Sequence, residues 1–304
     1  MHRPRPTAEA ARAGVRPVTG VALALVVAAA LAHALWNFVL KRARGGAAFM
    51  ALVAIVAVVL WAPAAAAEWQ LRGYRFELVH LWPIAASAAV HTAYFLLLDR
   101  GYRYGDLSVV YPLARATGPV LTVIVALVVL GERPGPVALG GALLVVAGAY
   151  LLTGNPLRLL SRDRPRGTGF ALLTGAAIAL YTVIDKIAVS RYLIPPIVFD
   201  WSCLAARILL LAPLVAWRDP ASFGAAGRAD RGAIVLVAIL SPLAYILVLS
   251  AMVFTPVSLV APAREMSIVF AALLGAHFLK EREPARRLAA AGAIVLGIVA
   301  LARG

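Results

Sequence analysis

Two lysines and two arginines lie inside apolar segments of this chain, and their positions match between its two halves. The run that ends at Lys41 matches the run that ends at Lys186, and the segment from Arg115 to Glu132 aligns without a gap with the segment from Arg264 to Glu281. An ionisable group inside an apolar span is costly to bury, so such groups mark functional sites by default. Ammonium and guanidinium groups in a polar cavity favour the binding of an anionic group such as a carboxylate.

Acidic side chains accompany these cations, but there are fewer of them. The expected buried charges are five cations and three acids: Lys41, Arg115, Lys186, Arg207 and Arg264 against Asp185, Asp200 and Glu265. This positive surplus suits an anionic or carboxylate-bearing ligand and suits a lipophilic cation poorly. For Arg115, the alternative is a packing role in which it bonds only backbone carbonyls or Glu265.

Polar and aromatic residues lie close to the matched charges. His33, Asn37 and Lys41 recur at every fourth position, so they share one face of a helix. The alternative for Lys41 is an interfacial position, with its stem reaching toward lipid headgroups. His91 is a further polar candidate within a span. The aromatic residues that could contact the organic body of a ligand are Trp36, Tyr94, Tyr111, Tyr181 and Tyr245.

Asp185 distinguishes the second half from the first, which has Leu40 at the matching position. It is the only acid in its predicted span, and the basic Lys186 follows it. We hypothesise that Asp185 exchanges a proton or accepts an ammonium group from a ligand. The alternative is that it only neutralises Lys186.

The composition indicates which kind of fold must position these residues. The chain has 304 residues, of which 62% are hydrophobic and 14% charged, with a mean hydropathy of +0.88. Soluble domains are about 45–50% apolar and about 25% charged. The sequence therefore predicts an all-α protein with many membrane spans, since a membrane barrel would show short alternating strands instead.

Several other classes of function have no support in the sequence. The net charge is +15, but the arginines lie mostly in short connections between spans and form no basic groove with aromatic platforms, so we expect no nucleic-acid partner. Cys203 is the only cysteine, which rules out an intrachain disulfide and argues against a cysteine metal site. No HExxH, GxxxxGK[ST] or GxSxG motif occurs, so we expect neither an enzyme nor a cofactor.

Ten apolar segments are long enough to cross a bilayer, five on each side of a polar linker. They are 18–40, 47–65, 79–98, 108–130 and 136–153, then 167–187, 196–217, 232–253, 257–279 and 286–302. The predicted organisation is a basic N-terminal tail (1–17), a first repeat (18–153), a linker (154–166) and a second repeat (167–304). Because each half has an odd number of spans, the second must enter the membrane from the other side. The halves are then inverted repeats, as in many transporters.

Two spans and the loop charges bear on assembly and orientation. Spans 136–153 and 286–302 are rich in glycine and nearly free of charge, so we expect scaffold contacts or a homodimer interface there. The loop charges favour an outer N-terminus under the positive-inside rule, whereas the arginine-rich tail favours an inner one.

Several motifs resemble those of one transporter family. The HALWNFVLK run from His33 to Lys41, the GDLSVVYPLAR run from Gly105 to Arg115 and the following GERP (131–134) resemble the EamA family of the drug/metabolite transporter superfamily. The second half repeats them as PARE (262–265) and KER (280–282), and the resemblance spans about residues 20–303. It implies inverted five-helix repeats, alternating access and cytoplasmic termini. It also implies a central cavity lined by the first, third, fourth, sixth, eighth and ninth spans.

The resemblance and the charges together predict a plasma-membrane exporter of a small polar or anionic metabolite, such as an amino-acid-like or phosphonate-like solute. Small multidrug-resistance relatives use a glutamate in their first helix, but this chain has Asn37 and Lys41 there and no acid. Their cation-antiport mechanism therefore does not transfer directly. The alternatives are a multidrug exporter, a non-transporting assembly protein and an intramembrane enzyme.

Overall fold

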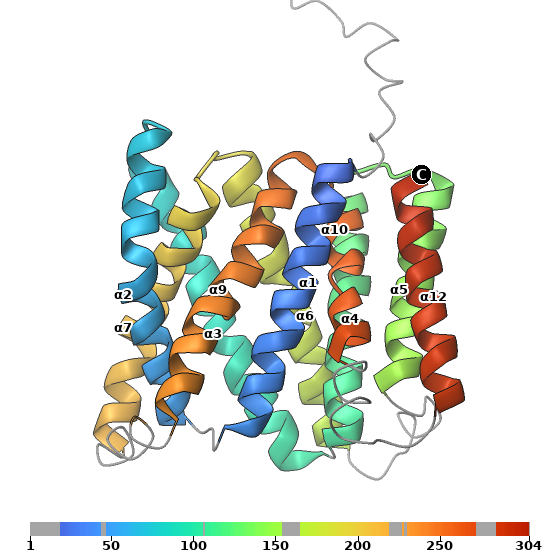
Figure 1. The fold of residues 1–304 in the computed structure, drawn as a ribbon, viewed down its shortest axis with the longest axis horizontal. Coiled ribbons are helices and arrows are strands. Elements are labelled where there is room, and N and C mark those ends of the chain that lie inside the picture. Colours follow the sequence, from blue (N-terminus) through green and yellow to red (C-terminus); the bar gives the residue numbers. More distant parts are fainter. Residues whose placement is uncertain are drawn as a thin grey trace, which may run out of the picture.

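The protein folds as a bundle of helices that stand side by side (Figure 1). The computed structural model describes residues 19–43, 47–105, 107–153, 165–218, 227, 230–271 and 284–303, and no strand occurs in these ranges. The first half contributes α1 (Gly20–Arg42), α2 (Ala47–Leu71), the short 3-10 helix η2 (Leu78–His80), α3 (Leu81–Tyr104), α4 (Leu107–Val128) and α5 (Pro136–Thr153). The second half contributes α6 (Pro165–Ser190), α7 (Pro196–Arg218), α9 (Arg231–Phe254), α10 (Val257–Ala263) and α12 (Pro284–Arg303).

Among the described residues, six helices are long and apolar enough to cross a membrane: α1, α2, α3 with η2, α4, α6 and α9. Shorter apolar helices lie at 136–151 and 289–303. At a rise of about 1.5 Å per residue, about 20 residues cross the hydrocarbon core. The predicted multi-pass helical membrane protein is confirmed. The predicted tail and most of the linker, residues 154–164, lie outside the described residues.

The glycine-rich helices α5 and α12 pack closely along each other at one edge of the bundle (Figure 1). Added Cβ atoms at Gly141, Gly148 and Gly297 would lie within 2.6–2.8 Å of backbone atoms or a side chain of the facing helix. Only glycine permits so close an approach in lipid. These glycines therefore serve a contact within the chain, and the homodimer stays a prediction.

The centre of the bundle is built around α6, the most deeply buried of the six long apolar helices. It packs along both α3 and α4, and it also contacts α9. On the other side, α1 packs along α9. The helix α10 packs mainly against α4 and α5, and all of its residues are buried. Residues from α3, α4, α6, α9 and α10 therefore face one interior.

Candidate functional site

An aromatic layer crosses this interior between α3, α6 and α9. The ring of His91 stacks on that of Tyr181 with centroids 3.9 Å apart, and Tyr245 lies edge-on to His91 at 5.8 Å. Tyr94 completes the layer, 6.1 Å from Tyr181. Four of the residues that the sequence singled out are thus brought together. The layer offers ring faces and edges to an organic molecule.

A cationic group lies next to this layer, where α4 meets the segment after α10. Nη2 of Arg115 is 3.0 Å from a carboxylate oxygen of Glu265, and it also donates a long hydrogen bond of 3.5 Å to Ser267. The side chain of Glu265 is 2% exposed and that of Arg115 is 13% exposed. Arg264 is buried beside Tyr181 and Tyr245, and among the described residues it makes no ion pair or side-chain hydrogen bond. The group thus has two guanidiniums and one carboxylate.

The segment that carries Arg264 and Glu265 contains a helix break, whereas the matching segment in α4 does not. The helix α10 ends at Ala263, Arg264 and Glu265 form a turn, and helical backbone resumes at 266–271. Within the turn, the amide of Glu265 donates to the Pro262 carbonyl at 2.9 Å, a short i to i−3 bond. The helix α4 runs unbroken through Arg115. The sequence predicted one helix over 257–279, so the break is a correction, and Pro262 just before it gives a reason.

Unsatisfied polar atoms remain within the cationic group. Nε of Arg115 is buried without a hydrogen-bond partner, and Oε2 of Glu265, the oxygen 3.0 Å from Nη2 of Arg115, lacks a hydrogen bond of acceptable geometry. The contact between the two residues is therefore an ion pair rather than an aligned, bidentate pair. His33 of α1 is close enough to Arg115 and Arg264 to interact with both charges.

A second, acidic group lies against the aromatic layer at Tyr245. The hydroxyl of Tyr245 donates a short hydrogen bond to Oδ2 of Asp185, which is fully buried. Oδ1 of Asp185 has no hydrogen-bond partner, although the Ser87 hydroxyl lies near it. Asp200 is buried nearby on α7, on the same helix face as Arg207 and about two turns before it.

Arg207 does not fully neutralise this second group. Within the described ranges it makes no direct ion pair with Asp185 or Asp200, and its Nε is buried without a partner. Two carboxylates and one guanidinium give the acidic group a negative balance, opposite to that of the cationic group. Tyr245 joins the two, since it bonds Asp185 and lies near Arg264.

Lys186 lies apart from both groups, on the face where α1 begins and α12 ends, called here the terminal face (top of Figure 1). Its ammonium donates to the carbonyls of Met252 at 2.6 Å and Thr255 at 2.9 Å, where α9 ends. The carboxylate of Glu132 accepts from the amides of Val257 at 2.8 Å and Ser258 at 2.9 Å, where α10 begins. A carboxylate at a helix start and an ammonium at a helix end both complement the helix dipole.

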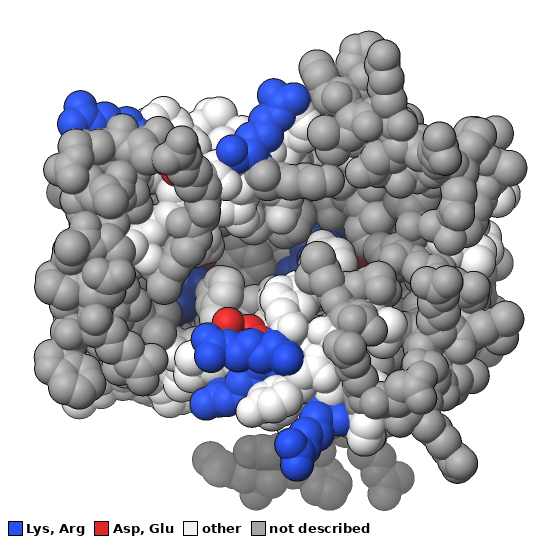
Figure 2. Space-filling model, turned by 90° about the horizontal axis from the view of Figure 1, so that it is seen from below, with Lys and Arg blue, Asp and Glu red and all other residues white. Residues whose placement is uncertain are grey.

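The two faces of the bundle differ in packing. At the terminal face, Thr255, Val257 and Ser258 are all buried, whereas Tyr111 and Tyr102 toward the opposite face are 37% exposed. Viewed from the opposite face, the molecule is hollowed at its centre, and charged atoms are visible inside the hollow (Figure 2). The described residues are thus packed more tightly at the terminal face than toward the opposite face.

The α1 candidates are placed differently from the rest. His33 lies edge-on to Trp36 at 5.0 Å, and Asn37 donates to the His33 carbonyl of its own helix at 2.8 Å. Trp36 packs against the apolar contact between α2, α7 and α9, with Nε1 buried and unpartnered. The Lys41 side chain lies outside the described residues.

Sequence reasoning missed three polar contacts. Ser87 lies beside Asp185, and its carbonyl is 2.9 Å from Nδ1 of His91. Ser267 meets Arg115, and Glu132 caps α10. Ser267 lies three residues after Arg264, and Glu132 ends the segment that both halves repeat, so these two carried a signal in the sequence. Ser87 carried none beyond being polar in an apolar span.

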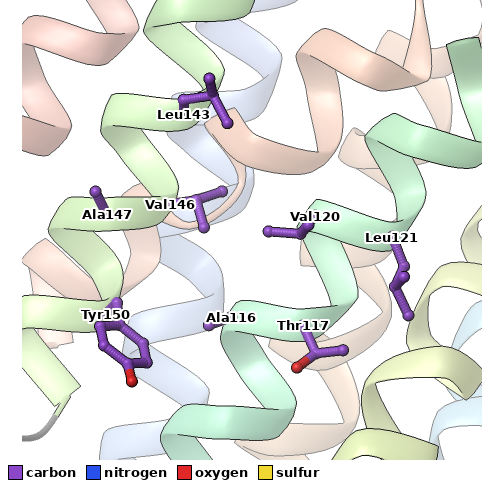
Figure 3. Close-up of a pocket in the computed structure, with 8 residues that line it drawn as sticks. All are labelled: Ala116, Thr117, Val120, Leu121, Leu143, Val146, Ala147 and Tyr150. Carbon is purple, nitrogen blue, oxygen red and sulfur yellow. The ribbon is translucent and has the colours of Figure 1, made fainter. Parts of the chain in front are cut away.

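A separate apolar pocket lies between α4 and α5 (Figure 3). It has a volume of about 370 Å³ and is lined by Ala116, Thr117, Val120, Leu121, Leu143, Val146, Ala147 and Tyr150. No charged side chain lines it, so it does not extend the polar interior. Within the part of the chain that the structure describes, no cluster of three His, Cys, Asp or Glu residues could hold a metal ion.

These features define a class of protein: a multi-pass helical membrane protein with charged groups around a central hollow. The model of the EamA-like transporter family matches residues 20–154 and again residues 165–303. The chain therefore belongs to the EamA family of the drug/metabolite transporter superfamily, whose members are membrane transporters rather than enzymes.

The fold is also similar to that of solved structures. One, titled "Crystal structure of protein", is 19% identical, with a TM-score of 0.74 over 93% of this chain and 97% of that chain. This similarity shows a shared fold alone. No curated protein matches the sequence.

Proposed function

We propose that this protein exports a small carboxylate-bearing, amino-acid-like solute across the plasma membrane by alternating access. The carrying observation is that the interior holds two guanidiniums and one neighbouring carboxylate: the partly buried Arg115 pairs with Glu265, and the buried Arg264 has no ion pair among the described residues. Such a group attracts an anion, because the interior has a low dielectric and an unpaired guanidinium there is costly. The carboxylate of the solute would bind at this group, with its organic part against Tyr181 and Tyr245.

The acidic group favours an amino-acid-like solute over a phosphonate-like one. Asp185 accepts a hydrogen bond from the hydroxyl of Tyr245, and Arg264 also lies near Tyr245, so groups of opposite charge lie close to one ring of the aromatic layer. A zwitterion has complementary charges at a similarly short separation. Asp185 would accept the ammonium group, or exchange a proton that couples the cycle.

Ten spans arranged as inverted repeats fit the observed packing. The contact of α1 with α9 has its counterpart in that of α6 with α3, and the contact of α2 with α9 in that of α7 with α3. The helix α6 packs along α4, and the described helix α10 packs against α4 and α5.

The contacts of Lys186 and Glu132 support a closed terminal face in this state. Both bind backbone groups at the junction of α9 and α10, so we propose that they act as a latch in place of binding solute. With cytoplasmic termini, the hollow opens to the outside, as in a carrier that has released an exported solute.

Ligand-dependent thermal stabilisation tests the choice of solute, because a bound ligand raises the free energy of unfolding. The purified protein is screened against the twenty L-amino acids, their amides and a series of phosphonates. We expect some amino acids to raise the melting temperature and their amides not to do so. The matched control is Arg103→Gln, which removes an exposed arginine paired with Asp99. Stabilisation by amides as strong as that by acids would refute the carboxylate site.

Cysteine labelling tests the access state. Single cysteines replace Tyr111 and Thr255 in a Cys203→Ala background, in oriented vesicles. A membrane-impermeant reagent should label position 111 from the opposite face and should not reach position 255 from the terminal face. Adding Lys186→Met should make position 255 reactive. Equal labelling from both faces in the parent would contradict a closed terminal face.

A further inference from the structure

We propose that Glu265 is a tethered competitor of the solute: its carboxylate occupies Arg115 in the empty carrier and is displaced when the solute carboxylate binds. This inference rests on the proposed anionic solute and adds a specificity-determining role for one residue. It differs from the expectation that Glu265 is itself a solute ligand.

The geometry of the pair is that of an exchangeable contact. Nη2 of Arg115 lies 3.0 Å from Oε2 of Glu265, but this contact lacks the geometry of a hydrogen bond, and Nε of Arg115 has no hydrogen-bond partner. A structural buried pair satisfies its remaining donors and acceptors, because each unsatisfied one costs free energy. The second donor of Arg115, to Ser267, is at the limiting distance of 3.5 Å. Arg115 therefore keeps donor capacity that a second carboxylate could use.

The local backbone allows Glu265 to move independently of Arg115. Glu265 lies in the turn between α10 and the helical residues 266–271, whereas Arg115 lies within the unbroken helix α4. The turn is held by short i to i−3 bonds, such as that from Ile268 to the Glu265 carbonyl at 2.9 Å. A small change in this turn would withdraw the carboxylate without moving the arginine.

The carboxylate of Glu265 also lowers the net charge of the empty interior. Arg115 and Arg264 together would leave two positive charges in the interior of an empty carrier, and changing the access state in that form is costly. With Glu265 in place, only one remains. Arg264, which has no ion-pair partner among the described residues, offers the incoming carboxylate its first contact, and Arg115 completes a two-guanidinium site as Glu265 leaves.

The competitor model and a purely structural role predict opposite signs. If Glu265 competes, Glu265→Gln frees Arg115 and strengthens the binding of carboxylates. If Glu265 only holds Arg115 in position, the same change weakens that binding. The amide is nearly isosteric with the carboxylate, so packing is preserved in both cases.

The test uses benzoate as the probe, with benzamide as its neutral counterpart, and measures affinity by calorimetry on the full-length protein. We expect Glu265→Gln to bind benzoate about tenfold more tightly, which corresponds to about 1.4 kcal/mol, with benzamide unchanged. The control Asp99→Asn removes an exposed acid and should leave the affinity for benzoate unchanged. Thermal unfolding of each variant verifies folding.

The remaining outcomes separate the two proposals. Weaker benzoate binding by Glu265→Gln, with binding by the wild type intact, would overturn the competitor and leave the anionic solute standing. An equal gain for benzamide would show a loosened pocket rather than a freed arginine and would also overturn it. If neither benzoate nor any L-amino acid binds to the wild type or to Glu265→Gln, the anionic site itself is refuted, and the competitor with it.

Discussion

The helix α4 and the segment around α10 carry matching sequence motifs but hold their arginines in different ways. Arg115 projects from a continuous helix and pairs with Glu265, whereas Arg264 lies in a turn between two helical pieces and has no ion-pair partner within the described ranges. The first half has Ala116 at the position that matches Glu265. The duplicated motif therefore supplies two cations, and a single substitution in one copy supplies the shared carboxylate.

This comparison shows how a duplicated fold can obtain an asymmetric site. The two matching sequence segments each bring an arginine to one interior, and residues present in only one half then set the charge. Asp185 is a second example, since Leu40 stands at its matching position. Both unmatched acids belong to the second half. We expect variants of Asp185 to alter the coupling of transport to protons and variants of Glu265 to alter competition with the solute. Variants of Arg115 should alter ligand binding and protein stability together.

The largest expected effect is that of Arg115→Gln on stability. It leaves the Glu265 carboxylate buried without its partner, which costs about 3 kcal/mol in the free energy of unfolding. The double variant Arg115→Gln/Glu265→Gln should recover most of this loss, because it also removes the orphaned negative charge of Glu265. Denaturation of both variants in detergent measures the difference. Equal stability of Arg115→Gln and the wild type would show that the pair contributes nothing.

Arg264→Gln should separate binding from stability. Because Arg264 has no ion-pair partner to orphan among the described residues, we expect a change of less than about 1 kcal/mol in unfolding free energy. The loss of one charged hydrogen bond to the solute should weaken carboxylate binding by about 1.5–3 kcal/mol. Calorimetry and denaturation of the same sample give both numbers. A stability loss as large as that of Arg115→Gln would erase the distinction between the two arginines.

Asp185→Asn tests whether the unmatched acid serves coupling. Flux into proteoliposomes is measured with and without a pH gradient, for the wild type and the variant. We expect the wild type to respond to the gradient and the variant to lose that response while it retains carboxylate binding. Identical responses with full flux would assign Asp185 no coupling role. Tyr245→Phe, which removes the hydroxyl that bonds Asp185, serves as the intermediate variant.

The smallest expected effect is that of Ser267→Ala. Its hydroxyl accepts from Arg115 at 3.5 Å, a distance at which a hydrogen bond contributes little. We expect less than about 0.5 kcal/mol in either ligand affinity or unfolding free energy. A larger loss of affinity would mean that Ser267 positions Arg115, and the competitor model would then need Ser267 as a second anchor.

The sequence by itself determined the class of fold, the family and the residues that carry charge into the membrane. These follow from composition and motif spacing. A membrane span is recognised by the length of its apolar run, and a charged residue within it stands out because burying a charge in the membrane costs free energy. Neither criterion depends on knowing which residues lie nearby in the fold. Arg115, Arg264, Glu265 and Asp185 could thus be named without a structure. Ser87 could not be named, because placing a serine in an apolar span costs too little free energy to indicate a functional role.

Only the tertiary structure decided which of these residues meet. Arg115 and Glu265 are 150 positions apart, and their contact depends on how α4 and the α10 turn are rotated toward one interior. The same holds for Tyr245 with Asp185, and for Lys186, whose ammonium binds carbonyls at the end of α9 rather than a matched acid. Helix rotation and the break after Ala263 arise from packing between distant segments. A periodic pattern in one segment contains no information about the orientation of another.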